Sequence, residues 1–443
     1  MPKYDYDVLY IGAGHGTFDG AIPLASKGYH VGVVEENRVG GTCPNWGCNA
    51  KISLDAPVQL VHAQKQMHNL VNGSLSVNWA NNMKHKHEVI DNLPDAIGGL
   101  MKNAKIDILH GHGQLNDAHT VKIGDQTKTA DKIVLATGLH SHRVNLPGSD
   151  LANDSQNFLS LNQMPKRIAV DGSGYIAMEF ATIALASGSQ VTVLMHHDKV
   201  LKKFYQPYVA KLVKYLKQQG MKFVPNANVK SFAKQGNQLV VNYGNQQKLT
   251  VDYVLDATGR NPNVKNLGLD QVGVKYDRHG IKVNDHLQTS VPNIYASGDV
   301  INSKEPKLTP TAIFESQYLT QLFSGATKDA IHFPFIPTVT FTSPRIAEFG
   351  VPVDEAKKSD QYTVEHHDLT GDWYRMVDQE SIADLTLVFN QQHQLVGATE
   401  ISDKADDSID TLLPAAVMKM TKQQIGRMVY LFPSIASDVW ANL

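Results

Sequence analysis

Short runs of apolar residues, separated by glycine-rich turns and helix-compatible stretches, dominate the first half of the chain. The runs at residues 6–11 and 31–34 predict buried strands, and the stretch between them, up to Lys27, is compatible with a helix. The same order returns at residues 167–170 and 190–194, again with a helical stretch between the strands. A strand–helix–strand unit that occurs twice indicates an α/β protein with two nucleotide-binding units.

Each unit has closely spaced glycines directly after its first strand: Gly12 and Gly14, then Gly172 and Gly174. Glycine lets the backbone turn tightly, and it lets a phosphate approach the N–H groups at the start of the next helix. Glu35 ends the second strand of the first unit, 23 residues after Gly12, where an acid that binds ribose hydroxyls is expected. The motif is imperfect, because Thr17 stands where a third glycine is usual. Both units nevertheless predict dinucleotide binding.

Composition and charge exclude several classes of partner. With 443 residues, of which 42% are hydrophobic and 19% charged, the chain is expected to form about two to four domains. A net charge of −2 gives no field to recruit nucleic acid or an anionic membrane, and no apolar run is long enough to span a bilayer. The first seven residues do not resemble a signal peptide, because the apolar run after them already predicts a strand. We therefore expect a cytoplasmic protein without a nucleic-acid or membrane partner.

The chain has only two cysteines, Cys43 and Cys48, and its local composition places them in a turn-rich segment. Two cysteines in so long a chain are typical of a reducing compartment, where a close pair is catalytic or metal-binding more often than structural. A zinc site would need further ligands, and no second cysteine pair exists. Histidine pairs such as His140 and His142 could bind copper or zinc, but polar surface positions explain them better, so no metal site is predicted. A cysteine pair beside a dinucleotide suggests electrons moving from a cofactor to a disulfide.

The segment Gly40-Gly41-Thr42-Cys43-Pro44-Asn45-Trp46-Gly47-Cys48 resembles the active site of the class I flavoprotein disulfide oxidoreductases, which include glutathione reductase, dihydrolipoamide dehydrogenase and mercuric reductase. The resemblance implies that Cys48 lies against the flavin as the charge-transfer thiolate and that Cys43 is the interchange thiol that meets the substrate. Two thiols are needed because one attacks the oxidant and the other resolves the adduct by exchange. Lys51 corresponds to a lysine near the flavin, although it stands one residue closer to the second cysteine than is usual.

The same resemblance assigns further residues to the two cofactors. For FAD these are Gly12, Gly14, Glu35, Thr42, Thr137, Gly138, Asp299 and Thr309. For the nicotinamide dinucleotide they are Gly172, Gly174, His196, His197, Lys202 and Gly259. Tyr175 would be the ring that covers the flavin and moves aside for nicotinamide, and Glu179 would pair with Lys51. Ala-Thr-Gly occurs at residues 136–138 and 257–259, where the chain of the family leaves each domain.

The family also implies a domain order. A Rossmann-like NAD(P) domain is inserted into a Rossmann-like FAD domain, and a C-terminal α+β domain forms the two-fold interface of a homodimer. By this resemblance residues 1–145 and 264–330 form the FAD domain, residues 146–263 the NAD(P) domain and residues 331–443 the dimerisation domain.

The second unit favours NADPH, with NADH as the alternative. Met195 replaces the acid expected at the end of its second strand. Hydrogen-bond donors follow it, namely His196, His197, Lys199, Lys202 and Lys203. Loss of an acid and gain of donors suits the 2′-phosphate of NADPH.

The C-terminal part departs from the family at one catalytic feature. The family has a His-Pro motif with a glutamate five residues later, and this histidine protonates the leaving thiolate as general acid. Phe432 and Ser437 stand at these positions, and no histidine follows His393. General-acid help is worth roughly 10²–10⁴-fold, so reduction of an ordinary disulfide should be poor.

The oxidant is therefore expected to be small and reactive, and hypothiocyanous acid fits because thiocyanate leaves as a stable anion. This extends the resemblance to the reactive-chlorine-resistance flavoproteins, with a role in oxidative stress and redox homeostasis. Two positions that hold glutathione-binding arginines in glutathione reductase are Ile22 and Gln317 here. A glutathione-reductase-like enzyme, a reductase of copper or mercury ions and a flavin-binding protein without catalysis remain alternatives.

Overall fold

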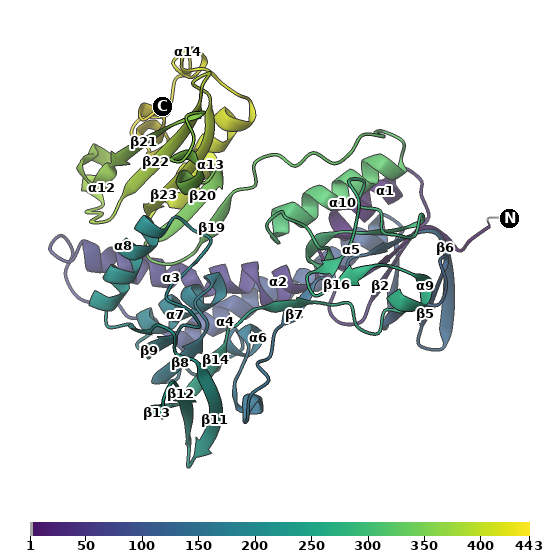
Figure 1. Cartoon of the computed structure of the whole chain (residues 1–443), viewed down its shortest axis with the longest axis horizontal. Coiled ribbons are helices and arrows are strands. Elements are labelled where there is room, and N and C mark those ends of the chain that lie inside the picture. Colours follow the sequence, from purple (N-terminus) through teal and green to yellow (C-terminus); the bar gives the residue numbers. More distant parts are fainter. Residues whose placement is uncertain (1–2) are drawn as a thin grey trace. The chain divides into compact units, whose positions relative to one another are not determined.

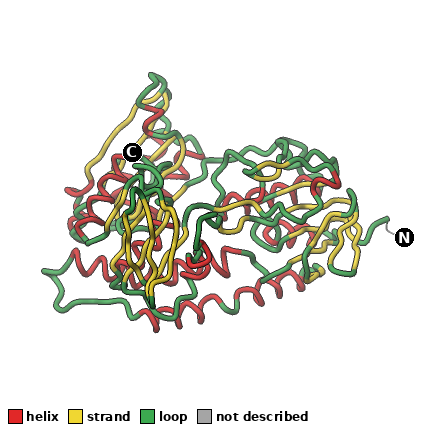
Figure 2. Tube along the Cα trace, turned by 60° about the horizontal axis from the view of Figure 1, so that its bottom comes forward, coloured by secondary structure: helices red, strands yellow, loops and turns green. Residues whose placement is uncertain are grey.

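The computed structural model describes residues 3–443, which form two compact units. The first unit consists of the chain up to Ser53, Lys84–His142 and Arg260–Phe333. The second unit consists of Leu54–Met83, Arg143–Gly259 and Pro334–Leu443. Both units combine helices with sheets (Figure 2).

The first unit is built on a seven-stranded sheet. Its order is β3 (Asp107–His110), β2 (Val31–Glu35), β1 (Tyr6–Ile11), β6 (Gln126–Leu135), β5 (Thr120–Ile123) and β4 (Gly113–Leu115), with β18 (Ile294–Ala296) also paired to β6. The β1, β2, β3, β6 and β18 pairings are parallel, whereas β4 and β5 add antiparallel pairings. The carboxyl ends of β1 and β2, which carry the predicted FAD residues, therefore lie at one edge of the sheet.

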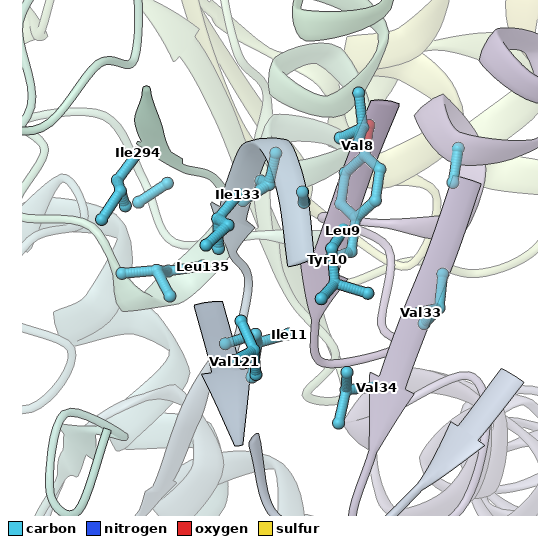
Figure 3. Packing of buried hydrophobic residues seen from close by; sticks show 14 of the residues in the cluster. Val8, Leu9, Tyr10, Ile11, Val33, Val34, Val121, Ile133, Leu135 and Ile294 are labelled. Atoms are coloured by element: carbon cyan, nitrogen blue, oxygen red, sulfur yellow. The ribbon is translucent and has the colours of Figure 1, made fainter. Parts of the chain in front are cut away.

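The central parallel strands of this sheet are apolar where both of their faces are covered, as in residues 8–11 of β1 and 133–135 of β6. Leu9, Tyr10, Ile133 and Ile294 are completely buried, and Figure 3 shows them packed together with neighbouring aliphatic side chains. Full burial of one such side chain stabilises the folded state by about 1.5–3 kcal/mol. The core thus fixes where each strand ends.

Two helices of the first unit, α1 (Phe18–Ser26) and α10 (Thr309–Phe323), pack side by side (Figure 1). The Thr320 hydroxyl donates to the Gly20 carbonyl at 2.7 Å. A Cβ at Gly20 would lie 2.2 Å from the Ser316 carbonyl oxygen, so only glycine permits this approach. The contact fixes α10 against α1, the helix that follows the turn after β1.

The first unit contains further helices and strands. They are α2 (Thr42–Trp46), α5 (Leu93–Asn103), β7 (Leu139–Ser141), β15 (Arg260–Pro262), α9 (Leu269–Val272), β16 (Tyr276–Asp277), β17 (Gly280–Ile281) and η2 (Gly298–Val300). Two helices, α3 (Cys48–Gln66) and α4 (Trp79–Ile90), have residues in both units.

The second unit contains a parallel sheet that repeats the strand–helix–strand order of the first. Its strands are β10 (Lys222–Val224), β9 (Gln190–Leu194), β8 (Arg167–Asp171) and β14 (Tyr253–Asp256), and α7 (Tyr175–Ala186) connects β8 to β9. An antiparallel sheet of β11 (Val229–Gln235), β12 (Gln238–Tyr243) and β13 (Gln247–Val251) follows in the chain, after α8 (Gln206–Gln218).

The C-terminal part of the second unit is an antiparallel sheet packed against a helix. The sheet order is β19 (Thr338–Thr340), β20 (Arg345–Gly350), β23 (Leu395–Ser402), β22 (Asp384–Asn390) and β21 (Tyr362–Asp368), and the helix is α13 (Ala405–Val417). Shorter helices are α11 (Val353–Ala356), α12 (Trp373–Val377), α14 (Lys422–Ile425) and α15 (Ile435–Ala441). Arg375 is buried here between two carboxylates and donates to Glu380 at 3.0 Å and to Glu400 at 2.8 Å.

Candidate active site and dinucleotide sites

The turn after β1 is held against the Ala136-Thr137-Gly138 motif. Gly12 has a φ of +102°, and a Cβ there would lie 2.4 Å from the Ala136 carbonyl oxygen. The Gly12 N–H donates to Val34 at 2.8 Å, and the Thr17 hydroxyl donates to the Gly12 carbonyl at 2.7 Å. Thr17 therefore closes the turn through its side chain, which explains why a third glycine is not needed.

Backbone donors converge at the start of α1, as a dinucleotide phosphate requires. Among residues 3–443, no protein group accepts a hydrogen bond from the N–H groups of Gly14, His15 and Gly16. Unpaired N–H groups beside a helix N-terminus favour an anion. This donor set fits the pyrophosphate of FAD.

Glu35 is the last residue of β2 and is buried. One carboxylate oxygen accepts the Ala13 N–H and the other accepts the Asn37 N–H, both at 2.8 Å. Burial raises the pKa of Glu35, and these two hydrogen bonds oppose the rise. The carboxylate is therefore fixed by the backbone, and its further lone pairs suit ribose hydroxyls.

The two cysteines lie on helices, so the expectation of a turn-rich segment is wrong at these positions. Gly40 and Gly41 have φ values of +95° and +67° and end the turn. Cys43 then lies in α2, and Cys48 is the first residue of α3, with Gly47 as the break between the helices. Across this break the two thiols are within hydrogen-bonding reach of one another.

The thiols share their hydrogen-bonding environment. Neither cysteine forms a disulfide in the described part of the chain. The hydrogen bond with Cys48 and burial raise the pKa of Cys43 well above its usual range. Cys48 Sγ lies 3.6 Å from Thr309 Oγ1, and Cys43 Sγ lies 3.7 Å from Asn49 Oδ1. A dithiol in this arrangement can close to a disulfide by giving up two electrons.

Thr309 opens α10, and Leu308 directly before it has extended backbone. The positive end of this 15-residue helix therefore lies beside Cys48, where it favours a thiolate over a thiol. Thr309 thus joins the cysteine pair in space, although 261 residues separate it from Cys48 in sequence.

Asp299 is held in a buried cluster that sequence reasoning identified only in part. Burial raises the pKa of Asp299, and Lys307 Nζ donates to the Asp299 carbonyl at 2.8 Å. Glu315, on α10, accepts the Gly298 N–H at 2.6 Å, and burial raises its pKa to about 8. Lys307 and Glu315 were missed. The available signal for Glu315 was that it is the single charged residue in the sequence of α10.

Thr137 and Gly138 lie where β6 leaves the sheet. The Thr137 hydroxyl donates to the Asn263 carbonyl, and the Asn263 amide donates to the Thr137 carbonyl, both at 2.7 Å. Gly138 has a φ of +66°. This reciprocal pair of hydrogen bonds joins the two chain segments at the point where the Ala-Thr-Gly motif was expected to mark the exit of the chain from the FAD domain.

The second dinucleotide turn repeats the first in detail. Gly172 has a φ of +124°, and a Cβ there would lie 2.4 Å from the Ala257 carbonyl oxygen. Within the described chain, the N–H groups of Ser173 and Gly174 have no protein acceptor. Gly259, which ends the second Ala-Thr-Gly motif, has a φ of +150°. The residues fit a second dinucleotide.

Three predicted cofactor residues lie after β9. His196, His197 and Lys202 are all exposed. His196 Nε2 lies 3.0 Å from Oδ1 of Asp171, the last residue of β8. Asp171 was missed because an acid ending a first strand matches no motif, and its partner is 25 residues away.

The other predicted catalytic residues belong to different units. Tyr175 is the first residue of α7 and is exposed. Glu179, in the same helix, is buried and accepts the Phe341 N–H at 3.0 Å. Lys51 lies in the first unit and Glu179 in the second, so their pairing stays a prediction.

Histidines of the pairs considered for metal binding form hydrogen bonds with neighbouring polar side chains. His112 lies 2.7 Å from a Glu36 carboxylate oxygen, and His140 lies 2.6 Å from the Asn263 amide oxygen. Across residues 3–443, no group of three or more histidine, cysteine or acidic side chains is arranged to hold a metal ion.

Two dinucleotide-binding turns and a dithiol beside a helix N-terminus are typical of an oxidoreductase that passes electrons between a dinucleotide cofactor and a cysteine pair. Residues 6–316 match the family described as pyridine nucleotide-disulphide oxidoreductase, and residues 336–442 match its dimerisation domain. The chain belongs to this family. The predicted fold class, the enzymatic class and the use of FAD with NAD(P)H are confirmed by this membership, and the dimerisation domain supports a homodimer.

Relatives span nearly the whole chain. Glutathione reductase of a Nostoc species is 30% identical over 98% of each chain. Dihydrolipoyl dehydrogenase of Geobacillus stearothermophilus is 31% identical, over 97% of this chain and 93% of that one. Mercuric reductase of Staphylococcus aureus is 31% identical over 91% and 76%. The solved structure of RclA from Escherichia coli, an HOCl-induced flavoprotein disulfide reductase, matches with a TM-score of 0.88 at 22% identity over 98% of each chain, which shows the same fold.

No helix in the described residues is both long and apolar enough to cross a membrane.

Proposed function

We propose that this enzyme uses NADPH and the Cys43–Cys48 pair to reduce a small reactive oxidant such as hypothiocyanous acid. The observation that carries the proposal is the replacement of the acid dyad of the family by Phe432 and Ser437. Phe432 is 76% exposed and stacks on Trp373 with ring centroids 6.0 Å apart. Ser437 Oγ donates to the Ser434 carbonyl at 2.7 Å at the start of α15. Neither side chain titrates near neutral pH.

The chemistry needs no acid from the protein to expel a leaving group. When bound beside the cysteines, FAD would pass two electrons from NADPH to the disulfide. The Cys43 thiolate then attacks the sulfur of hypothiocyanous acid: a sulfur–sulfur bond forms, the sulfur–oxygen bond breaks, and the oxygen leaves as water by taking a proton from solvent. The Cys48 sulfur next attacks Cys43 Sγ, closes the disulfide and displaces thiocyanate. Two electrons pass from the dithiol to the oxidant, and thiocyanate leaves as a stable anion.

The arrangement around the cysteines supports these roles. The hydrogen bond to Cys48 raises the pKa of Cys43, so the proton of the pair stays preferentially on Cys43. Cys48 faces Thr309 at the start of α10, where a negative charge is stabilised. Cys43 becomes the attacking thiolate by passing its proton to Cys48 or to solvent. The proposed roles of Lys51 and of the Tyr175 and Glu179 side chains rest on the family resemblance.

Two further observations weigh on the choice of substrate. Ile22 on α1 is half-buried and Gln317 on α10 is exposed, so neither position supplies a guanidinium for the carboxylates of glutathione. The fold that the chain shares with an HOCl-induced reductase supports an oxidant of the reactive chlorine class. The names of the other relatives favour disulfides or mercuric ion as the alternatives to be tested.

The test is a substrate panel with the purified, FAD-loaded protein. We expect NADPH to be consumed much faster with hypothiocyanous acid than with glutathione disulfide, lipoamide or mercuric ion. The matched control is the double variant Phe432→His with Ser437→Glu, which restores the acid dyad at one exposed and one half-buried position. It should raise turnover of glutathione disulfide at least about tenfold, because general-acid help is worth roughly 10²–10⁴-fold. A wild-type enzyme that prefers glutathione disulfide would overturn the proposal.

A further inference from the structure

A buried carboxylate lies under the predicted cofactor site of the second unit. Asp171 ends β8 and is completely buried, and its Oδ1 lies 3.0 Å from His196 Nε2. Within residues 3–443 its Oδ2 has no hydrogen-bond partner. The neighbouring strand carries Asp256 in register, but that carboxylate accepts hydrogen bonds from the Val144 and Thr258 N–H groups. Among the described residues, the Asp171 carboxylate therefore has His196 as its single side-chain partner. Burying a charge with so few partners is costly, which suggests that the carboxylate is kept for a functional reason.

The His196 ring joins this carboxylate to the surface. Its side chain is 49% exposed, and Nδ1 has no protein partner in the described chain. Because Asp171 accepts from Nε2, the proton of a neutral ring is fixed at Nε2 and Nδ1 is left as an acceptor. A second proton turns Nδ1 into a donor that faces solvent. The ring can therefore bind an anion only when it is doubly protonated.

The charges around His196 favour that second proton. The hydrogen bond to Asp171 raises the pKa of His196, burial opposes the rise, and the charges of Asp171 and Asp256 add to it. Asp171 is on β8 and Asp256 on β14, while Asp198 and Lys199 follow His196 on its own loop. Two buried acids thus stand behind the ring.

We propose that Asp171 is a positioning residue that keeps His196 doubly protonated, so that Nδ1–H donates to the 2′-phosphate of NADPH. The inference rests on the proposed use of NADPH and specifies how the chain recognises it. His196 directly follows Met195, which replaces the ribose acid at the end of β9. The affinity for a 2′-phosphate therefore depends on whether His196 carries its second proton, on Nδ1.

This linkage predicts how affinity depends on pH. The folded-state pKa of His196 is raised, so the bonus from the 2′-phosphate is fully present below that pKa and is lost as pH rises through it. Above it, affinity should fall by up to about tenfold per pH unit for one coupled proton. A phosphate loses part of its charge below about pH 6, so the informative range begins near pH 6.5. Asp171→Asn keeps an acceptor but removes the charge, and it should move the fall to lower pH.

The experiment is calorimetric titration of the FAD-loaded protein with adenosine 2′,5′-bisphosphate and with AMP, which lacks the 2′-phosphate. The readout, from about pH 6.5 to 9, is the dissociation constant of AMP divided by that of the bisphosphate, so a high ratio means that the 2′-phosphate strengthens binding. We expect the ratio to fall with pH in the wild type and to fall from a lower pH in Asp171→Asn. In His196→Arg it should stay high throughout. A matched control is His366→Gln, since His366 Nε2 also lies 3.0 Å from a buried carboxylate, that of Asp384, outside the nucleotide sheet.

The outcomes separate this inference from the proposed function. A wild-type ratio that is flat over the pH range, or an Asp171→Asn ratio that follows the wild type, overturns the inference. If Asp171→Asn does not fold, proton uptake on ligand binding decides. The wild type should bind as much as about one additional proton with the bisphosphate compared with AMP, and His196→Arg should bind none. Since no oxidant is present, failure to reduce hypothiocyanous acid leaves the linkage intact, and loss of the linkage leaves the choice of oxidant intact.

Discussion

Gly12 and Gly28 offer a matched test of what holds the FAD turn. Both have positive φ, +102° and +94°, and both lie in the first strand–helix–strand unit. A Cβ at Gly28 meets nothing within 4 Å, whereas a Cβ at Gly12 would lie 2.4 Å from the Ala136 carbonyl oxygen, about 1 Å short of an ordinary contact. The two alanine variants therefore share the cost of a left-handed backbone, about 1–2 kcal/mol, and differ in the clash.

The additional cost at Gly12 follows from the bonds beside it. To relieve the clash, the turn must move away from Ala136, which strains the hydrogen bonds from Gly12 N–H to Val34 and from Ala136 N–H to Ile11, both 2.8 Å. Loss of one buried hydrogen bond costs about 1–3 kcal/mol. The apoprotein can relax this turn, but FAD needs it in place. Gly12→Ala should therefore weaken FAD binding by roughly 5- to 150-fold relative to Gly28→Ala.

The assay is removal of FAD followed by titration back into the apoprotein, with quenching of flavin fluorescence as the signal. Gly28→Ala should give a dissociation constant close to that of the wild type and a slightly lower Tm. The reasoning is refuted if Gly12→Ala binds FAD as tightly as the wild type. It is also refuted if Gly28→Ala weakens FAD as much as Gly12→Ala does.

Three further predictions concern buried charges and the thiols. The pKa of Glu315 is raised to about 8, so the folded state loses stability as pH rises from the ordinary carboxyl range toward 8. Glu315→Gln should therefore raise Tm at pH 8.5 and have little effect on Tm at pH 5. Equal effects at the two pH values would contradict this. Arg375→Met leaves two buried carboxylates without their cation and should lower the free energy of unfolding by about 3–5 kcal/mol, measured by denaturant titration, with an unchanged midpoint as the contrary result. Cys48→Ala removes the hydrogen bond that raises the pKa of Cys43, so alkylation of Cys43 by iodoacetamide at pH 7 should become faster; a slower reaction would contradict the assignment.

The strands were predictable because burial on both faces leaves a strong local pattern. The apolar runs at residues 6–11 and 190–194 match β1 and β9. The turn glycines were predictable for a similar reason, since a positive φ restricts the residue type locally. The helical state of Cys43 was not, because α2 has only five residues and its formation depends on packing around Gly40 and Asn45.

Contacts between distant segments account for what sequence reasoning missed. Glu315 is fixed by the Gly298 N–H, and Lys307 by the carbonyls of Asp299 and His279. No local spacing encodes these pairs, because they depend on how α10 packs on η2 and on how the loop before α10 reaches η2 and the turn between β16 and β17. The resemblance to a family supplied Thr309 and Asp299, which composition and periodicity alone do not identify.

The two dinucleotide units share their turn geometry, so the choice of cofactor must come from the ends of their strands. In the first unit, Glu35 at the end of the second strand carries a carboxylate that the Ala13 and Asn37 N–H groups hold in place, and we expect it to accept from ribose hydroxyls. In the second unit the acid stands at the end of the first strand, as Asp171, and His196 lies between it and solvent. Under the proposed roles, an acid one strand away with a histidine beside it would present a cation to the cofactor in place of an anion. By this proposal, a ribose acceptor becomes a phosphate donor site without any change in the glycine turn.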